Sequence, residues 1–206
     1  MSKIDFKYND GSEVFFTSDS HFNHENIINF CHRPFQSLEE MNKTLVDNWN
    51  AKVKENDVVF HLGDFAWGGS GVWKWFRERL NGHIILIKGN HDIKQMSSTA
   101  EMLFDYVAQQ TYIEVEGQKM YLNHYPLLCY AGTYRNRNDL VWALNGHTHI
   151  GPLSKEGKDY KRMELTFPTQ YDVGVDMNNF SPISFHELKE RMDYQIDNNV
   201  NMIHWV

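Results

Sequence analysis

Five short clusters of aspartate, asparagine and histidine lie between residues 19 and 149, and each ends an apolar run that is typical of a strand. In α/β proteins ligands bind in the crevice beyond the carboxyl ends of the strands, so we expect the five clusters to meet at one site. The clusters are Asp19-Ser20-His21, Gly63-Asp64, Gly89-Asn90-His91-Asp92, His124 and Gly146-His147-Thr148-His149.

The residue types in these clusters suit metal ions. Residues two apart on an extended segment point the same way, so Asp19 and His21 can reach one cation, and His147 and His149 repeat this spacing. Carboxylate, amide and imidazole donors without a thiolate suit Mn, Fe, Zn, Co or Ni better than Ca or a structural cysteine–zinc site. The clusters offer seven candidate ligands, which is more than one four-coordinate zinc ion needs. Seven ligands suit two divalent transition-metal ions, roughly 3.5–4 Å apart, that share a carboxylate. The expected metal ligands are Asp19, His21, Asp64, Asn90, His124, His147 and His149.

Each cluster alone also has a plainer interpretation. An Asp-x-His or Gly-Asp pair is commonly a turn or a helix cap, and Gly89-Asn90-His91-Asp92 fits a turn after a buried strand as well as it fits a metal site. Gly146-His147-Thr148-His149 is more specific, because two imidazoles rarely crowd together for packing. The occurrence of all five clusters in order, each at a strand end, is what favours the metal site.

The apolar runs predict the elements that carry these clusters. Helices are expected at 37–54, where Ser37 and Glu40 can form a capping box, at 72–80 and at 184–197. Strands alternate with helices early and hairpin-like strands dominate late, which predicts an α/β fold with a mixed sheet or two packed sheets. No Pro/Gly/Ser-rich linker divides the chain, so residues 1–206 are expected to form one domain. The expected strands are 14–18, 57–62, 83–87, 112–116, 118–122, 140–144 and 171–175.

Charge and cysteine content exclude several classes of protein. The 206-residue chain has a net charge of -7, whereas proteins that neutralise many phosphates are usually basic, so long duplex nucleic acid is not an expected partner. Cys31 and Cys129 form no disulfide framework or CxxC pair, and we interpret them as free thiols in a reducing cytosol. Without a signal-peptide core or an apolar stretch of about 20 residues, the chain is expected to be soluble and cytoplasmic, with no membrane partner.

The ordered clusters resemble those of the calcineurin-like metallophosphoesterase superfamily. That family's pattern is Asp-x-His, Gly-Asp, Gly-Asn-His-Asp/Glu, a His and Gly-His-x-His, and this chain matches it over roughly residues 14 to 150. The resemblance, which is to the small, single-domain bacterial or phage type, implies two packed mixed β-sheets flanked by helices, a four-layer αββα sandwich. It also implies a metal-dependent phosphoric ester hydrolase.

The resemblance also implies a role for each matching residue. Asp64 would bridge two metals, and His91 would not be a ligand but would face the phosphate and protonate the leaving oxygen. A hydroxide shared by the two metals would then attack phosphorus, as hypothesised for such binuclear sites. One metal would be held by Asp19, His21 and His149, and the other by Asn90, His124 and His147.

One position departs from the family's pattern. Many members carry a second Asp three residues after the bridging one, where it supports the catalytic histidine, but Trp67 stands at this place. Asp92 can substitute as the partner of His91, so we take His91 and Asp92 as the catalytic candidates. The departure favours substrates with good leaving groups over the most demanding monoesters. It also weakens the analogy with the protein-phosphatase branch, whose Gly-Asp-x-x-Asp-Arg block is absent.

Several residues near the clusters are candidates for substrate binding. Asn23 and His24 follow the first cluster and can lie at the pocket rim, although they also fit the capped start of a helix. Arg33 can pair bidentately with a phosphate or lie on the surface, and Arg135 and Arg137 are similar candidates. Trp67, Trp73 and Trp75 can stack on a nucleobase, although the spacing of Trp73 also fits core packing.

Together these features predict a phosphodiesterase or phosphatase that acts on a phosphate-ester small molecule or a nucleotide. Phosphodiesters are favoured, and phosphomonoesters remain possible. A nuclease for short or single-stranded nucleic acid is one alternative, and a non-catalytic metal-binding scaffold module is another. The sequence does not indicate the physiological substrate, the native metal or the oligomeric state.

Overall fold

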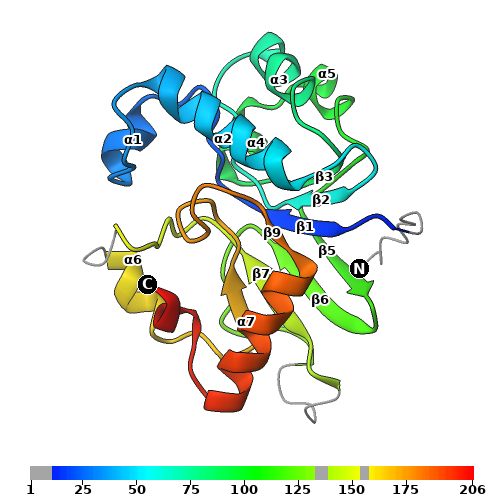
Figure 1. Cartoon of the computed structure of the whole chain (residues 1–206), viewed down its shortest axis with the longest axis vertical. Coiled ribbons are helices and arrows are strands. Elements are labelled where there is room, and N and C mark those ends of the chain that lie inside the picture. Colours follow the sequence, from blue (N-terminus) through cyan, green and yellow to red (C-terminus); the bar gives the residue numbers. More distant parts are fainter. Residues whose placement is uncertain (1–10, 133–138, 154–157) are drawn as a thin grey trace.

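The structure is a computed structural model, and it describes residues 11–132, 139–153 and 158–206. Two β-sheets lie face to face in the middle of the molecule, and helices lie on their outer sides (Figure 1). Both sheets contain parallel and antiparallel neighbours. The predicted fold class, an α/β chain with two packed mixed sheets flanked by helices, is therefore confirmed.

The first sheet has five strands in the order β4-β3-β2-β1-β9. The neighbours from β4 to β1 run parallel, and β9 is antiparallel at the edge. Because a parallel sheet is covered on both faces, its strands are mostly apolar rather than alternating, and all four residues of β1 and of β2 are buried. The strands are β1 (Val14–Thr17), β2 (Val58–His61), β3 (His83–Ile87), β4 (Tyr106–Ala108) and β9 (Ile183–Ser184).

The second sheet has four strands in the order β5-β6-β7-β8. β5 (Gln110–Val115) and β6 (Gln118–Asn123) form the predicted hairpin. Its turn residues, Glu116 and Gly117, both have positive φ, as the right-handed twist of a tight hairpin requires. β6, β7 (Trp142–Asn145) and β8 (Gln170–Asp172) are parallel.

The two longest helices begin where side chains satisfy their first backbone N–H groups. The Ser37 hydroxyl accepts from the N–H of Glu40 at the start of α2 (Leu38–Lys52). Ser184 and Glu187 form a capping box at the start of α7 (Phe185–Asn198), which contacts β9 and β1 of the first sheet. The others are α1 (Asn26–Phe30), α3 (Ser70–Arg77), α4 (Asn90–Gln95), α5 (Ser98–Glu101), α6 (Lys158–Met163) and a 3-10 helix (Met202–Trp205).

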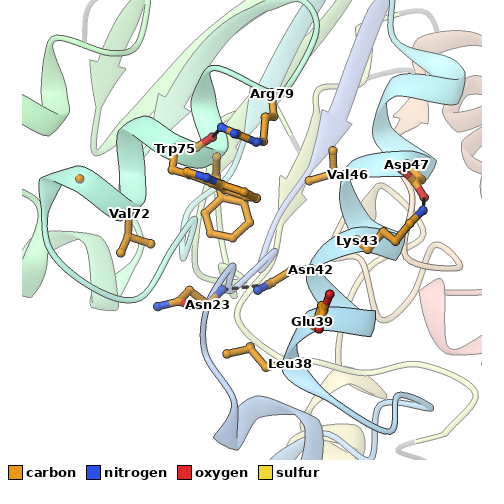
Figure 2. Close-up of a pocket in the computed structure, with 12 residues that line it drawn as sticks. Asn23, Leu38, Glu39, Asn42, Lys43, Val46, Asp47, Val72, Trp75 and Arg79 are labelled. Atoms are coloured by element: carbon orange, nitrogen blue, oxygen red, sulfur yellow. Dashed lines mark hydrogen bonds and ion pairs between the residues drawn. The ribbon is translucent and has the colours of Figure 1, made fainter.

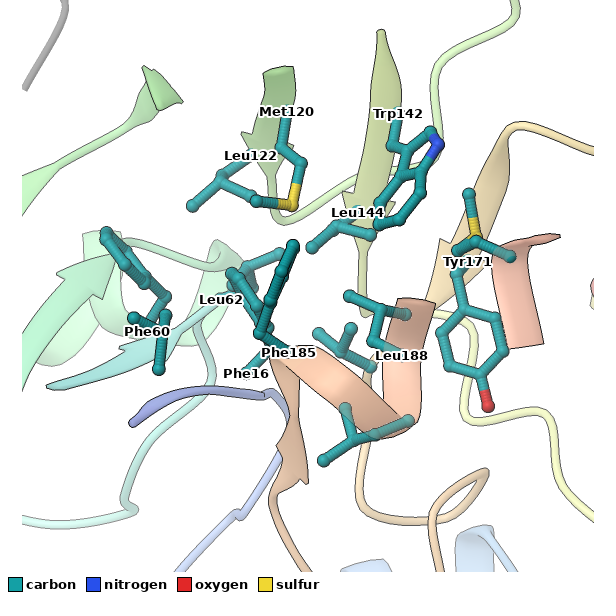
Figure 3. Packing of buried hydrophobic residues seen from close by; sticks show 14 of the residues in the cluster. Phe16, Phe60, Leu62, Met120, Leu122, Trp142, Leu144, Tyr171, Phe185 and Leu188 are labelled. Atoms are coloured by element: carbon teal, nitrogen blue, oxygen red, sulfur yellow. The ribbon is translucent and has the colours of Figure 1, made fainter. Parts of the chain in front are cut away.

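Two hydrophobic clusters hold these layers together. One fills the space between the sheets, where Phe16 and Phe60 stack with ring centroids 5.6 Å apart and α7 contributes Phe185 and Leu188 (Figure 3). The other lies between the first sheet and helices α2 and α3, and includes Trp49. Burial of large side chains on both faces holds the first sheet rigidly, so its strand ends form a fixed platform.

The seven predicted strands and three predicted helices all exist; β3 has the predicted bounds, and the ends of the others are shifted. The last strand, β8, ends at Asp172 instead of residue 175, and beyond it only an isolated bridge joins Gly174 to Ser18. The helix expected at 72–80 also ends early, at Arg77. Helices α4, α5 and α6, the short 3-10 helix, and strands β4 and β9 were not expected, whereas α1 follows the possible helix start at Asn23 and His24. Within the described ranges, every helix is too short or too polar to cross a membrane.

Candidate metal centre

The polar clusters lie together at one edge of the two sheets. β1, β2 and β3 are parallel and end beside one another, and Asp19, Asp64 and Asn90 follow them. β6 and β7 are parallel neighbours in the second sheet, and His124 and His147 follow these. The two sets are joined where the His147 N–H donates to the Asp19 carboxylate at 2.9 Å. The predicted convergence of five strand ends is therefore observed.

Asp19, His21 and His149 form the first group of donor atoms. One donor atom from each lies within 4.8 Å of the other two, which is close enough for one metal ion. The Asp19 Oδ1 atom is 3.6 Å from Nε2 of His149 and 4.0 Å from Nε2 of His21. Two imidazoles and one carboxylate are the donors that transition metals prefer.

Asp64, His124 and His147 form the second group, with donor atoms that also lie within 4.8 Å of one another. The amide oxygen of Asn90 is 3.1 Å from Nε2 of His124, which brings a fourth donor to this side. Asp64 Oδ2 is 3.6 Å from Nε2 of His124 and 3.5 Å from Nε2 of His21. The Asp64 carboxylate therefore lies between the two groups.

Two buried polar atoms in this region have no hydrogen-bond partner among the described residues. They are Asp19 Oδ1 and His21 Nε2, which face each other across the first group. Buried polar atoms are almost always paired, because an unpaired one forfeits its hydrogen bonds to water. A cation held between these atoms would satisfy both, so the donor set fits a metal ion.

The charges at the site also favour a cation. Burial and the neighbouring Asp19 carboxylate raise the pKa of Asp64 to about 7. Burial lowers the pKa of His21 well below its ordinary value, which leaves a neutral imidazole with a lone pair. Burial also lowers the pKa of His149, but Asp19 and Asp176 outweigh this effect and raise it well above its ordinary value. Positive charge is therefore stabilised where these carboxylates meet.

The backbone at the site adopts a conformation that is rare outside glycine. Left-handed conformations of this kind cost free energy and persist only where surrounding contacts impose them. Two backbone hydrogen bonds do so here, because Asp19 N–H donates to Gly63 O at 2.9 Å and His21 N–H donates to Asp64 O at 3.0 Å. The residues with positive φ are Asp19 (56°), His21 (48°), Asp64 (55°), His147 (73°) and His149 (49°).

Two glycines of the motifs permit close packing of the loops. A Cβ atom at Gly89 would lie 2.2 Å from Oδ1 of Asp64, and one at Gly146 would lie 2.2 Å from Oδ2 of Asp19. Neither position has room for a side chain. The glycines therefore precede Asn90 and His147 because the loops must touch the carboxylates of their neighbours.

His91 lies at the more exposed side of the centre, with about a third of its side chain accessible (31%). Its Nε2 atom is 3.9 Å from Oδ2 of Asp64, and its ring is 5.2 Å from that of His21 and 5.3 Å from that of Trp67. Its backbone N–H donates to Asp64 Oδ1 at 2.9 Å. His91 thus reaches the centre from the side that a substrate can approach.

Asp92 does not take the role that the sequence suggested. Its fully buried carboxylate accepts backbone N–H groups from Asp64 (2.7 Å), Phe65 (3.0 Å) and Gly89 (2.9 Å). Burial raises its pKa even though these three donors favour the charged form. With both oxygens engaged, Asp92 holds the loops after β2 and β3 together and does not support the His91 ring.

Arg33 is neither a surface residue nor an open phosphate-binding group, so both interpretations of it were wrong. Its side chain is buried and forms a bidentate ion pair with Asp176, with Nε and Nη2 each 2.9 Å from a carboxylate oxygen. It also donates to the carbonyl oxygens of Asp19 (2.7 Å) and Ser20 (3.2 Å). Its hydrogen-bonding capacity is taken up by the protein.

Of the two candidates for the pocket rim, the His24 side chain lies against the metal centre and the Asn23 side chain points away from it. His24 belongs to the centre, because its Nδ1 is 3.2 Å from Nδ1 of His21 and its ring stacks on Trp67 with centroids 4.4 Å apart. Asn23 is turned away, since its side chain donates to the Trp67 carbonyl at 3.0 Å and its N–H donates to Asn42. Neither residue caps α1 through its side chain. Arg135 and Arg137 lie outside the described residues.

The three tryptophans are dispersed. Trp73 is fully buried in the core, as its helical spacing allowed. Trp75 is half exposed and carries the Arg79 guanidinium 3.7 Å above its ring. Trp75, Arg79 and Asn23 line a groove of about 740 Å³ between α2 and α3 (Figure 2). Only Trp67, among these tryptophans, contacts the histidines of the centre.

The sequence interpretation missed Asp176, which contacts the centre directly. Its Oδ2 atom accepts a hydrogen bond from Nδ1 of His149 at 2.9 Å. Burial raises its pKa, but Arg33 and His149 outweigh this effect and lower it to about 2. The signal was present, because Asp176 follows the apolar run 171–175 just as the other clusters follow theirs.

The chain is similar to several known proteins over most of its length. MJ1445 of Methanocaldococcus jannaschii, named only as an uncharacterized protein, is 34% identical over 175 residues, which cover 84% of this chain and 86% of the relative. The Gene 66 protein of Mycobacterium phage L5 is 27% identical over 193 residues, which cover 80% and 87%. The crystal structure of AQ665 from Aquifex aeolicus, a protein of unknown function, has a TM-score of 0.66 and 26% identity, over 87% of this chain and 99% of that one.

A family model describes the same region of the chain. The calcineurin-like phosphoesterase superfamily domain matches residues 13–163, a span that includes all five polar clusters. The chain therefore belongs to the calcineurin-like phosphoesterase superfamily and is a phosphoric ester hydrolase.

Proposed function

We propose that this enzyme hydrolyses phosphodiesters, and phosphomonoesters less readily, with two divalent transition-metal ions. The observation that carries the proposal is the position of the Asp64 carboxylate, 3.5 Å from His21 and 3.6 Å from His124, between two groups of donor atoms. The first ion would be held by Asp19, His21 and His149, and the second by Asn90, His124 and His147, with Asp64 shared. The unpaired buried atoms of Asp19 and His21 support this assignment.

When bound, the two ions would neutralise charge on the phosphate and lower the pKa of a water molecule. The residues of the chain supply the rest. The donor atoms of Asp64 and Asn90 have fixed positions. The Asp64 carboxylate accepts a hydrogen bond from the N–H of His91, and Asn90 lies in the first turn of α4. The His91 imidazole, at the accessible side, would donate a proton to the leaving oxygen.

The surroundings of His91 support a preference for substrates with good leaving groups. The carboxylate nearest to it in the described structure is that of Asp64, at 3.9 Å, and the Asp92 carboxylate is engaged elsewhere. Burial lowers the pKa of His91, and the positive charge of Lys94 lowers it further. A histidine without its own carboxylate partner is protonated less readily, so it is less able to donate a proton to a poor leaving group. The most demanding monoesters are therefore the least suitable substrates.

Reconstitution with single metals tests this function. The protein would be stripped of metal, reloaded separately with Mn, Zn, Fe, Co or Ni, and assayed on phosphodiesters, phosphomonoesters, cyclic nucleotides and single-stranded oligonucleotides. We expect two bound equivalents and turnover of small diesters, with loss of both in Asp64→Asn. Two bound equivalents without turnover of any substrate would overturn the proposal in favour of a scaffold, and turnover confined to oligonucleotides would favour a nuclease.

A further inference from the structure

The Asp176 carboxylate connects two residues that reach the centre from different parts of the chain. Oδ2 accepts from Nδ1 of His149 and from Nη2 of Arg33, and Oδ1 accepts from Nε of Arg33, all at 2.9 Å. The Arg33 and Asp176 side chains are largely buried, so water competes little for these bonds. A carboxylate held by a bidentate guanidinium has a fixed orientation.

The same arginine also fixes the backbone of the first cluster. Nη2 of Arg33 donates to the Asp19 carbonyl at 2.7 Å, and Nη1 donates to the Ser20 carbonyl at 3.2 Å. The Arg33–Asp176 pair is therefore in contact with both Asp19 and His149. Asp19 follows β1 of the first sheet and His149 follows β7 of the second, so the pair connects donor atoms from both sheets.

The contact with Asp176 determines which nitrogen of His149 faces the centre. A carboxylate can only accept, so Nδ1 of His149 carries the proton that it donates to Asp176. Nε2 then points toward Asp19 Oδ1, 3.6 Å away, where a metal ligand is needed. In the second group, His124 is oriented by an uncharged acceptor, because its Nδ1 lies 2.7 Å from the carbonyl oxygen of Leu62.

We propose that Asp176, held by Arg33, is a positioning residue that fixes the tautomer and orientation of His149 and so sets the affinity of the first metal site alone. This inference rests on the metal assignment proposed above. A carboxylate that accepts from a metal-bound histidine makes the imidazole a more basic ligand, and loss of such a partner typically costs about 10–100-fold in metal affinity. Among the described residues, Asp176 contacts His149, whereas Nδ1 of His124 in the second group lies beside the Leu62 carbonyl oxygen, so we expect the affinity of the second site not to depend on Asp176.

Titration of Asp176→Asn with metal tests the proposal. The amide keeps the size of the side chain but offers one acceptor instead of two, so it cannot serve both Arg33 and His149 fully. The matched control is Asp57→Asn, since Asp57 is another buried carboxylate, which accepts the N–H groups of Glu13 (2.8 Å) and Lys54 (2.7 Å) away from the centre. Calorimetry with Zn²⁺ and the absorption bands of bound Co²⁺ would measure each site.

We expect Asp176→Asn to bind one equivalent about 10–100-fold more weakly and the other normally, while Asp57→Asn binds both normally. Two unchanged affinities in Asp176→Asn would overturn the positioning role and leave the proposed function intact. Equal weakening of both sites would also overturn it. A wild-type protein that binds no metal would instead overturn the metal assignment, and this inference with it.

Loss of Asp176 leaves the buried Arg33 charge unpaired, which can prevent folding. Imidazole NMR of the Zn²⁺-loaded wild-type protein tests the proposal without any substitution. We expect the His149 ring to carry its proton on Nδ1, with that proton protected from exchange with solvent. A proton on Nε2 would overturn the proposal.

Discussion

The Asp92 carboxylate accepts a hydrogen bond of 2.7 Å from the backbone N–H of Asp64. It also accepts from Phe65 and Gly89, so one buried side chain joins the loop that follows β2 to the loop that follows β3. The backbone of Asp64, the proposed bridging ligand, is thus held in place by a second carboxylate that is fully buried.

Replacement of Asp92 should therefore lower stability. In Asp92→Asn the amide NH₂ would face backbone N–H groups that need acceptors, and an unpaired buried donor costs about 1–3 kcal/mol. Urea denaturation of the metal-free protein measures this loss. The control Asp193→Asn removes an exposed pair with Lys189 and should change stability by less than about 1 kcal/mol. Wild-type stability with reduced turnover would instead restore Asp92 to the catalytic residues.

Replacement of the shared carboxylate should disturb both metals, whereas replacement of Asp19 should chiefly weaken one. Asp64 lies within 3.6 Å of histidines from both groups, but the Asp19 carboxylate belongs to the first group. Metal content of Asp64→Asn and Asp19→Asn after gel filtration, measured by elemental analysis, compares the two. Loss of a single equivalent from Asp64→Asn would contradict the bridging role.

Removal of the His91 imidazole should slow turnover most for substrates with poor leaving groups. A positioned proton donor typically contributes about 10²–10⁴-fold, and an activated leaving group such as nitrophenolate hardly needs it. Turnover of His91→Ala on alkyl and nitrophenyl esters, with both metals bound, measures the difference. His186→Ala is the control, because that histidine lies exposed on α7. Equal losses on both substrates would argue against proton donation by His91.

A methyl group at Gly89 should disrupt the centre. The added Cβ would lie 2.2 Å from Asp64 Oδ1 and 2.7 Å from Asp64 N, so the bridging carboxylate would have to move. We expect Gly89→Ala to lose metal and stability together. Gly71→Ala is the matched control, since its Cβ would meet nothing within 4 Å in α3, and alanine is favoured over glycine in a helix by about 0.5–1 kcal/mol. Normal metal content in Gly89→Ala would show that the loops can separate.

The strands and polar clusters could be predicted because their signals are local. Each cluster follows a mostly apolar run, as expected for a parallel strand that is buried on both faces, so the change from apolar to polar residues reveals where a strand ends. The starts of α2 and α7 were equally readable, because Ser37 and Ser184 cap N–H groups only three residues away. The two-residue strand β9 is too short to carry such a pattern.

The partners of charged side chains could not be read in this way. Nothing in the neighbourhood of Arg33 indicates that it pairs with a carboxylate 143 residues away, and nothing near Asp92 indicates that its acceptors serve the loop of Asp64. A buried charge takes whichever partner the packing of the two sheets brings within about 3 Å. Local spacing thus reveals which residues can hold a metal, whereas the residues that hold those ligands in place are defined by which loops meet when the sheets close.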